Sequence, residues 1–190
     1  MQLSTVAAAL VAAVVVAAVS PYLARLTLTV PDRGDALWWR ARRATSASRS
    51  AAVAVVGLGC GGLAGASAGR VHWPGSELAG LLGSGLVWLG FVWLGLIVTP
   101  LVVIDLEHHR LPDRLVGAGL VGGTILLGAA TTLDRDPAAL SRAALAAVIM
   151  LVLFGFLSMT TGFGFGDTKL ATVLAGYEGW LGWEYVSQPS

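Results

Sequence analysis

The stretch Gly162-Phe163-Gly164-Phe165-Gly166-Asp167-Thr168-Lys169 lies between two apolar runs near the C-terminus. Its one carboxylate, on Asp167, stands on backbone that glycine makes permissive. A charged side chain beside a membrane segment costs free energy, so a functional role is the first hypothesis for such a residue. We therefore search the rest of the chain for a partner of Asp167.

The composition identifies the chain as a polytopic membrane protein. Of its 190 residues, 56% are hydrophobic and 12% are charged, and the mean hydropathy is +0.77. A soluble domain carries about 25% charged residues. The formal net charge is +1 and no basic stripe stands apart from the membrane-flanking arginines, so we expect no nucleic-acid partner. Cys60, the only cysteine, lies in an apolar run, which indicates an inert thiol.

Apolar runs of membrane-spanning length recur along the chain. We predict an all-α, polytopic transmembrane helix bundle forming one membrane-embedded domain, with about six spans near residues 3–24, 51–69, 78–104, 115–133, 143–161 and 170–186. The second span carries glycines four residues apart, a ridge that lets neighbouring helices approach closely: Gly57, Gly61, Gly65 and Gly69. Trp180 suits a membrane interface.

Basic residues orient the predicted bundle. The 31–50 loop carries five arginines, which marks it as cytoplasmic and puts the N-terminus outside. Alternation then places the 105–114 and 162–169 loops inside as well. No basic residue precedes the first apolar run, so we interpret that run as an uncleaved helix rather than a signal peptide.

The second polar interruption reads Asp105-Leu106-Glu107-His108-His109-Arg110-Leu111-Pro112-Asp113-Arg114. Asp105 lies at the mouth of the third span, on the same predicted side as Asp167. Pro112 disfavours helix at Leu111 and prepares a turn into the next helix. An aspartate at a helix start is favourable as a cap or with the helix dipole, so we assign Asp113 a structural role.

Asp105 and Asp167 form the candidate catalytic pair. Two carboxylates a few ångströms apart share a proton. One then acts as base on a water while the other donates a proton to the carbonyl or the leaving amine, which is the apparatus for peptide-bond hydrolysis. The charge pattern alone leaves an alternative open, in which both aspartates are interfacial charges paired with Arg110 and Lys169.

Other chemistries fit less well. His108 and His109 are adjacent and point in different directions in a helix, and no separated second cluster exists, so we expect no metal and no cofactor. A non-enzymatic alternative is a transporter subunit that uses the carboxylates as a proton relay. Relay carboxylates tend to lie within the membrane depth, whereas both aspartates are predicted at loop–helix junctions on one side.

At these two loops the sequence resembles the type IV prepilin peptidases, aspartic proteases of the membrane. Their first aspartate lies in a segment like residues 105–113, and their second closes a Gly-x-Gly-Asp motif, here 164–167, usually followed by a lysine, here Lys169. A related intramembrane protease with another substrate class shares the Gly-x-Gly-Asp motif but lacks the proline-bearing first loop.

The resemblance implies cleavage of the leader peptide from prepilins or pilin-like secretion proteins at the cytoplasmic face of the inner (plasma) membrane. By carry-over, Asp105 and Asp167 are catalytic. Gly164 and Gly166 are assigned to substrate binding because glycine permits close backbone approach by an extended peptide, and Lys169 is assigned to the same site from its position in the sequence. Lys169 is also a candidate for holding the second loop. The expected partners are the lipid bilayer and a prepilin or pseudopilin substrate, and a homo-oligomer stays open.

Two departures from the family pattern matter. Many members carry a cysteine-containing cytoplasmic domain associated with N-methylation, for which the 31–50 loop is too short, so we predict the short form without the N-terminal methyltransferase domain. Family members usually continue with one or two helices after the Gly-x-Gly-Asp helix. This sequence stops at Ser190, so we expect a shortened protein or a truncated sequence.

Overall fold

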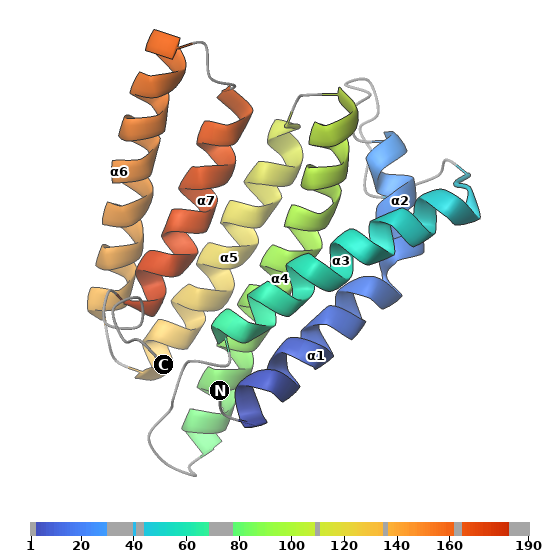
Figure 1. Cartoon of the computed structure of the whole chain (residues 1–190). Coiled ribbons are helices and arrows are strands. Elements are labelled where there is room, and N and C mark those ends of the chain that lie inside the picture. Colours follow the sequence, from blue (N-terminus) through green and yellow to red (C-terminus); the bar gives the residue numbers. More distant parts are fainter. Residues whose placement is uncertain are drawn as a thin grey trace.

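The computed structural model describes residues 3–29, 40, 44–68, 78–108, 111–134, 137–161 and 165–182. These residues form helices and short connections, without a strand in the described ranges. The helices are α1 (Leu3–Ala18), α2 (Ser20–Thr29), α3 (Ala47–Ala68), α4 (Leu78–His108), α5 (Asp113–Asp134), α6 (Pro137–Thr161) and α7 (Phe165–Leu181) (Figure 1). The predicted all-α fold class is confirmed.

Four of these helices are long and apolar enough to cross a membrane: α3, α5, α6 and the Leu81–His108 part of α4. Helices α1 and α2 add a fifth span if the bent pair is taken as one. Helix α7 has 17 residues. At 1.5 Å per residue it is about 26 Å long, at the short end of what spans a hydrocarbon core.

The first apolar run differs from the single span predicted at 3–24. Helix α1 ends at Ala18, α2 begins at Ser20, and the two are bent by 55°. Pro21 accounts for the break, because proline has no N–H to donate to the preceding turn yet is tolerated in the first turn of a new helix. The Val19 carbonyl opens that new helix by accepting the N–H groups of Tyr22 and Leu23, at 3.0 and 3.1 Å.

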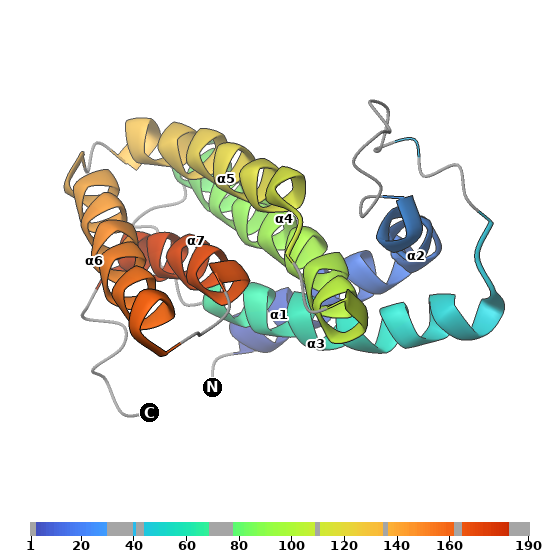
Figure 2. The ribbon, with the colours of Figure 1, turned by 90° about the horizontal axis from the view of Figure 1, so that it is seen from above.

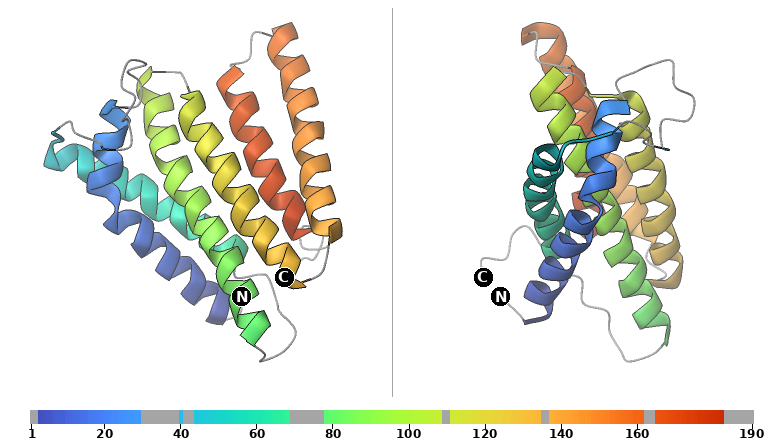
Figure 3. Two further views of the ribbon diagram at one scale, coloured as in Figure 1. Left: turned by 180° about the vertical axis from the view of Figure 1, so that it is seen from behind. Right: turned by 90° about the vertical axis from the view of Figure 1, so that its right-hand side faces the viewer.

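Helices α4 to α7 run alternately up and down beside one another (Figures 1 and 3). One end of the bundle therefore gathers several helix ends, and α2 finishes there too. We call it the motif end and define it by the terminal residues of these helices: Thr29, His108, Asp113, Thr161 and Phe165. The alternation brings both predicted motifs to this end.

The glycine ridge of α3 packs against α1. A Cβ atom added at Gly61 would lie 2.8 Å from the carbonyl oxygen of Ala12, and one at Gly65 would lie 2.5 Å from that of Ala8. Both neighbours are backbone atoms, which cannot move aside cheaply. The predicted close helix approach is confirmed at these positions, while Gly69 lies outside the described residues.

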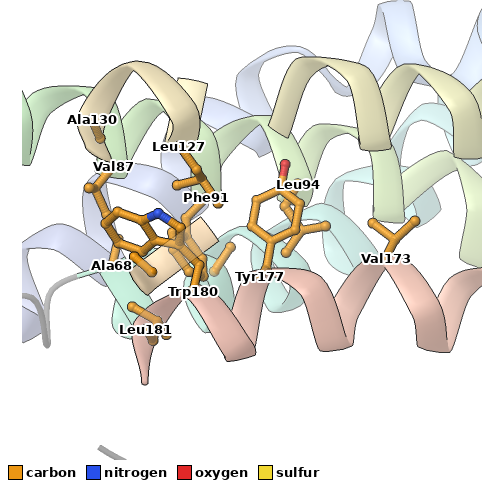
Figure 4. Packing of buried hydrophobic residues seen from close by; sticks show 12 residues of the cluster. Ala68, Val87, Phe91, Leu94, Leu127, Ala130, Val173, Tyr177, Trp180 and Leu181 are labelled. Atoms are coloured by element: carbon orange, nitrogen blue, oxygen red, sulfur yellow. The ribbon is translucent and has the colours of Figure 1, made fainter. Parts of the chain in front are cut away.

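The position of α7 is set by two buried aromatic residues near its C-terminal end (Figure 4). The Tyr177 ring packs edge-on against Phe91 of α4, with ring centroids 5.4 Å apart. Trp180 donates from Nε1 to the Thr131 hydroxyl of α5 over 2.9 Å. Trp180 is therefore buried between helices, where its indole N–H finds a partner, and its depth relative to a membrane interface stays a prediction. Gly182, at φ 96°, follows the last turn.

Candidate active site

Asp105 stands one turn before the end of α4, which runs on to His108 into the region predicted as a loop. It follows Ile104, which is 1% exposed and belongs to the core, and precedes Leu106, which is 70% exposed. Asp105 itself is half-buried. Its place is therefore the boundary between the packed core and the surface of the motif end.

Pro112 immediately precedes α5. The Pro112 carbonyl accepts the N–H groups of Leu115 and Val116 at 3.1 and 3.3 Å. Asp113 is the first residue of α5, where the helix dipole stabilises negative charge. Its carboxylate also accepts a hydrogen bond from the ammonium of Lys169. The sequence predicted a structural position for Asp113 but not this partner.

Asp167 is the third residue of α7, so the second motif is helical from Phe165 onward rather than a loop to Lys169. Gly166, just before it, lies against Leu111 of the first motif. A Cβ atom at Gly166 would come within 2.5 Å of Leu111 Cδ1 and 3.3 Å of its Cβ. Any side chain there would displace Leu111. Gly164, the other predicted substrate-binding glycine, lies outside the described residues.

Thr168 anchors the first turn of α7, and sequence reasoning missed it. Its side chain is fully buried, and its Oγ1 donates to the Phe154 carbonyl of α6 over 3.2 Å. The Thr172 hydroxyl in turn donates to the Thr168 carbonyl at 2.7 Å. The available signal was the four-residue spacing of these threonines, which puts both hydroxyls on one helix face.

Two contacts thus join the motifs at the start of α7: Leu111 with Gly166, and Asp113 with Lys169. Seen from above in Figure 2, α7 lies between α6 and the α4–α5 pair. Asp105 and Asp167 come from elements far apart in sequence and reach the same end of the bundle. The described helices that carry the two motifs therefore reach the same end of the bundle, as predicted.

The charges at this end are paired in a way that the sequence did not indicate. Lys169 forms its ion pair with Asp113 of α5, not with Asp167. Within the described helices, no ion pair or side-chain hydrogen bond involves Asp105 or Asp167. The ion pair of Lys169 with Asp113 thus involves neither candidate aspartate, while Arg110, the other predicted counter-charge, lies outside the described residues. The alternative in which both aspartates are interfacial charges stays open.

The described ranges contain no group of three or more His, Cys, Asp and Glu side chains arranged to hold a metal ion. His108 is half exposed, with Nδ1 4.0 Å from Glu107 Oε2, and His109 lies outside those ranges. The expectation that no metal takes part stays a prediction.

Comparison with known proteins gives one match. The model of the type IV leader peptidase family matches residues 88–188, more than half of the chain, and this region contains both motifs. No curated protein matches the sequence, and no solved structure matches the chain.

Proposed function

The chain belongs to the type IV leader peptidase family, and on that premise we propose that it is a membrane aspartic endopeptidase that removes leader peptides. Membership supports a peptidase, and the apolar helices support a membrane protein. The proposed substrate is a prepilin or a pilin-like secretion protein. Asp105 and Asp167 are the proposed catalytic residues.

The observation that carries this proposal is the junction between the two motifs. Leu111 packs on Gly166 and Asp113 pairs with Lys169, so the segment after Asp105 is held against the turn that carries Asp167. An aspartic dyad requires two carboxylates from separate elements at one place. In addition, Asp105 and Asp167 form no ion pair within the described helices. Their carboxylates are therefore available for proton transfer, whereas a carboxylate with a purely structural role is typically ion-paired.

In the proposed reaction one carboxylate is ionised and the other is protonated. The ionised carboxylate takes a proton from a water as the water oxygen bonds to the carbonyl carbon of the scissile peptide, and the protonated carboxyl gives its proton to the carbonyl oxygen. When the tetrahedral gem-diol collapses, the C–N bond breaks and the leaving nitrogen takes the proton that the first carboxyl had received from water. The other carboxylate takes a proton back from a gem-diol hydroxyl, so both carboxyl groups return to their starting states. The water is consumed, and no cofactor is required.

The remaining predicted site residues receive supporting roles. Gly164 and Gly166 are proposed to take part in substrate binding, because glycine lets an extended peptide approach the backbone. At Gly166 the side on which a Cβ would lie is filled by Leu111, so a peptide would have to approach from another side. Lys169 is proposed to hold the first turn of α7 through Asp113, and to contact substrate only secondarily, because its ammonium is already engaged.

The motif end is proposed to face the cytoplasm in a plasma (inner) membrane. Basic residues of the described helices lie near it, among them Arg49 in the first turn of α3, Arg114 in the first turn of α5 and Lys169 near the start of α7. An excess of Lys and Arg in short loops and at span ends favours the cytoplasmic side.

Co-expression with a candidate prepilin tests the proposal, read as the mass of the prepilin N-terminus. The wild-type chain should shorten the prepilin by its leader and add no methyl group. Asp105→Asn and Asp167→Asn keep the shape of each side chain but remove its acid–base function, so each should leave the prepilin at full length. Leader removal by either variant would contradict the two-aspartate mechanism.

A further inference from the structure

Arg49, in the first turn of α3, contacts two other helices at the motif end. Its Nη2 lies 2.5 Å from Oε2 of Glu107, in the last turn of α4. Its Nε and Nη2 also donate to the hydroxyl of Thr27 in α2, over 3.2 and 3.0 Å. One guanidinium therefore connects α2, α3 and α4, and Asp105 lies on the last of these.

The Thr27 hydroxyl uses its full hydrogen-bonding capacity. The Thr27 side chain is completely buried, and its Oγ1 donates to the Ala24 carbonyl over 2.8 Å while accepting both bonds from Arg49. A hydroxyl has one proton and two acceptor positions, so all three are used. The planar guanidinium is held from this side in a fixed orientation, which a lysine ammonium could not reproduce.

The backbone of Arg49 is fixed as well. Ser46 precedes α3, and its Oγ accepts the N–H of Arg49 over 3.2 Å while its carbonyl accepts the N–H of Ser50 over 3.1 Å. This is a serine N-cap, which sets where the helix begins and which residue is third in it. The backbone of Arg49 is thus held by Ser46 and its guanidinium by Thr27, independently of Glu107.

Among the described residues, the last turn of α4 has few other contacts that would hold it. Ile104 is the last core residue of the helix, and Leu106, Glu107 and His108 are all exposed. A helix end without buried apolar contacts opens locally at little free-energy cost. The ion pair of Arg49 with Glu107 is only partly exposed, at 22% and 37% of the two side chains, so solvent screens it less than a fully exposed pair.

We propose that Arg49 is a positioning residue for Asp105, acting through Glu107 to hold the last turn of α4 in one orientation. The inference rests on the proposed function, because it gives Asp105 a reacting role that needs orientation. The α7 side has the same pattern: Lys169 stands two residues after Asp167 and is bonded to α5. Each candidate aspartate is followed, two residues later, by a side chain that is ion-paired to another helix.

The experiment measures kcat and KM for leader cleavage of a purified model prepilin by the full chain in detergent. The variants are Arg49→Gln, Glu107→Gln and the double variant, with Arg49→Lys as the conservative change. Arg25→Gln is the matched control, because Arg25 is an exposed arginine on α2 whose loss removes the same charge. Thermal unfolding of each variant is followed in parallel.

Each single variant should lower kcat about tenfold while KM stays within about twofold, as expected for a displaced reacting group. The double variant should be no slower than either single variant, because both remove one connection. The kcat of Arg49→Lys should lie between those of Arg49→Gln and the wild type, since lysine keeps the charge but lacks the planar guanidinium. The kcat of Arg25→Gln should match that of the wild type.

Three results would overturn the inference: a kcat for Glu107→Gln within twofold of wild type, multiplicative losses in the double variant, or an equal loss in Arg25→Gln. If Arg49→Gln fails to fold, Glu107→Gln decides alone, because its side chain lies at the surface. The proposed function is contradicted by different results: a wild-type chain that does not cleave the prepilin leader, or an Asp105→Asn variant that does.

Discussion

The ammonium of Lys169, the fifth residue of α7, forms an ion pair with the carboxylate of Asp113, the first residue of α5. The pair ties the helix that carries Asp167 to the first residue of the helix that follows the Asp105 helix. It also engages the ammonium of Lys169 with a carboxylate other than that of Asp167.

Removing this ion pair should slow leader cleavage only modestly. Asp113 is 78% exposed at its side chain, and such a pair contributes about 1 kcal/mol or less, so Lys169→Met and Asp113→Asn should each slow cleavage by at most about fivefold. The double variant should be no slower than either single variant. The rates are measured on a model prepilin, with Glu178→Gln on the same helix as the control.

An alanine at Gly166 should impair cleavage through its contact with Leu111. The added Cβ would lie 2.5 Å from Leu111 Cδ1, so Leu111 or the start of α7 must shift, and a displaced catalytic group costs about 10- to 100-fold in rate. Leu111→Ala should restore much of the loss in the Gly166→Ala background, because it removes the obstructing atom.

Gly117→Ala is the matched control for the change at Gly166. An added Cβ at Gly117 meets nothing within 4 Å, so this substitution should leave cleavage unchanged. If Gly166→Ala is equally harmless, or if Leu111→Ala does not help it, the contact between the two motifs has no part in activity.

The Thr168 hydroxyl should matter for both stability and cleavage. Thr168→Val keeps the shape of the side chain but loses the bond to the Phe154 carbonyl, which is worth about 1 kcal/mol. In a chain of this length such a loss lowers the melting temperature by about 2–4 °C. Thr168→Ser should recover most of it.

The control for Thr168 is Thr132→Val, since the Thr132 hydroxyl is exposed and bonds within its own helix, to the Ala129 carbonyl. Thermal unfolding in detergent and the cleavage rate are both measured. Equal effects of the two valine variants would contradict a specific anchoring role for Thr168.

The approach of α3 to α1 should not tolerate a side chain at Gly65. Gly65→Ala would place Cβ 2.5 Å from the backbone oxygen of Ala8, and overpacking of this kind destabilises by about 1–3 kcal/mol. Gly59→Ala meets nothing within 4 Å and should leave stability unchanged or raise it slightly, since alanine is the better helix former. Chemical or thermal unfolding in detergent compares the two.

Much of the fold follows from the sequence, because membrane helices are encoded locally. The apolar runs predict the helices α3 to α6, since a segment in lipid must satisfy its own backbone hydrogen bonds. The four-residue spacing of the glycines predicts which face of α3 packs closely against a neighbouring helix, because this spacing puts them on one face of the helix. The break at Val19 was missed because the apolar composition continues through it, although Pro21 was visible in the sequence.

By itself, the sequence determined the class of protein, the order of the helices and the two aspartates most worth testing, because composition, length and short motifs are properties of a single chain segment. Only the tertiary structure decided which side chains meet: Lys169 with Asp113, Leu111 with Gly166, Thr168 with the Phe154 carbonyl and Trp180 with Thr131. Those contacts depend on the rotation of each helix about its axis, which packing against its neighbours sets.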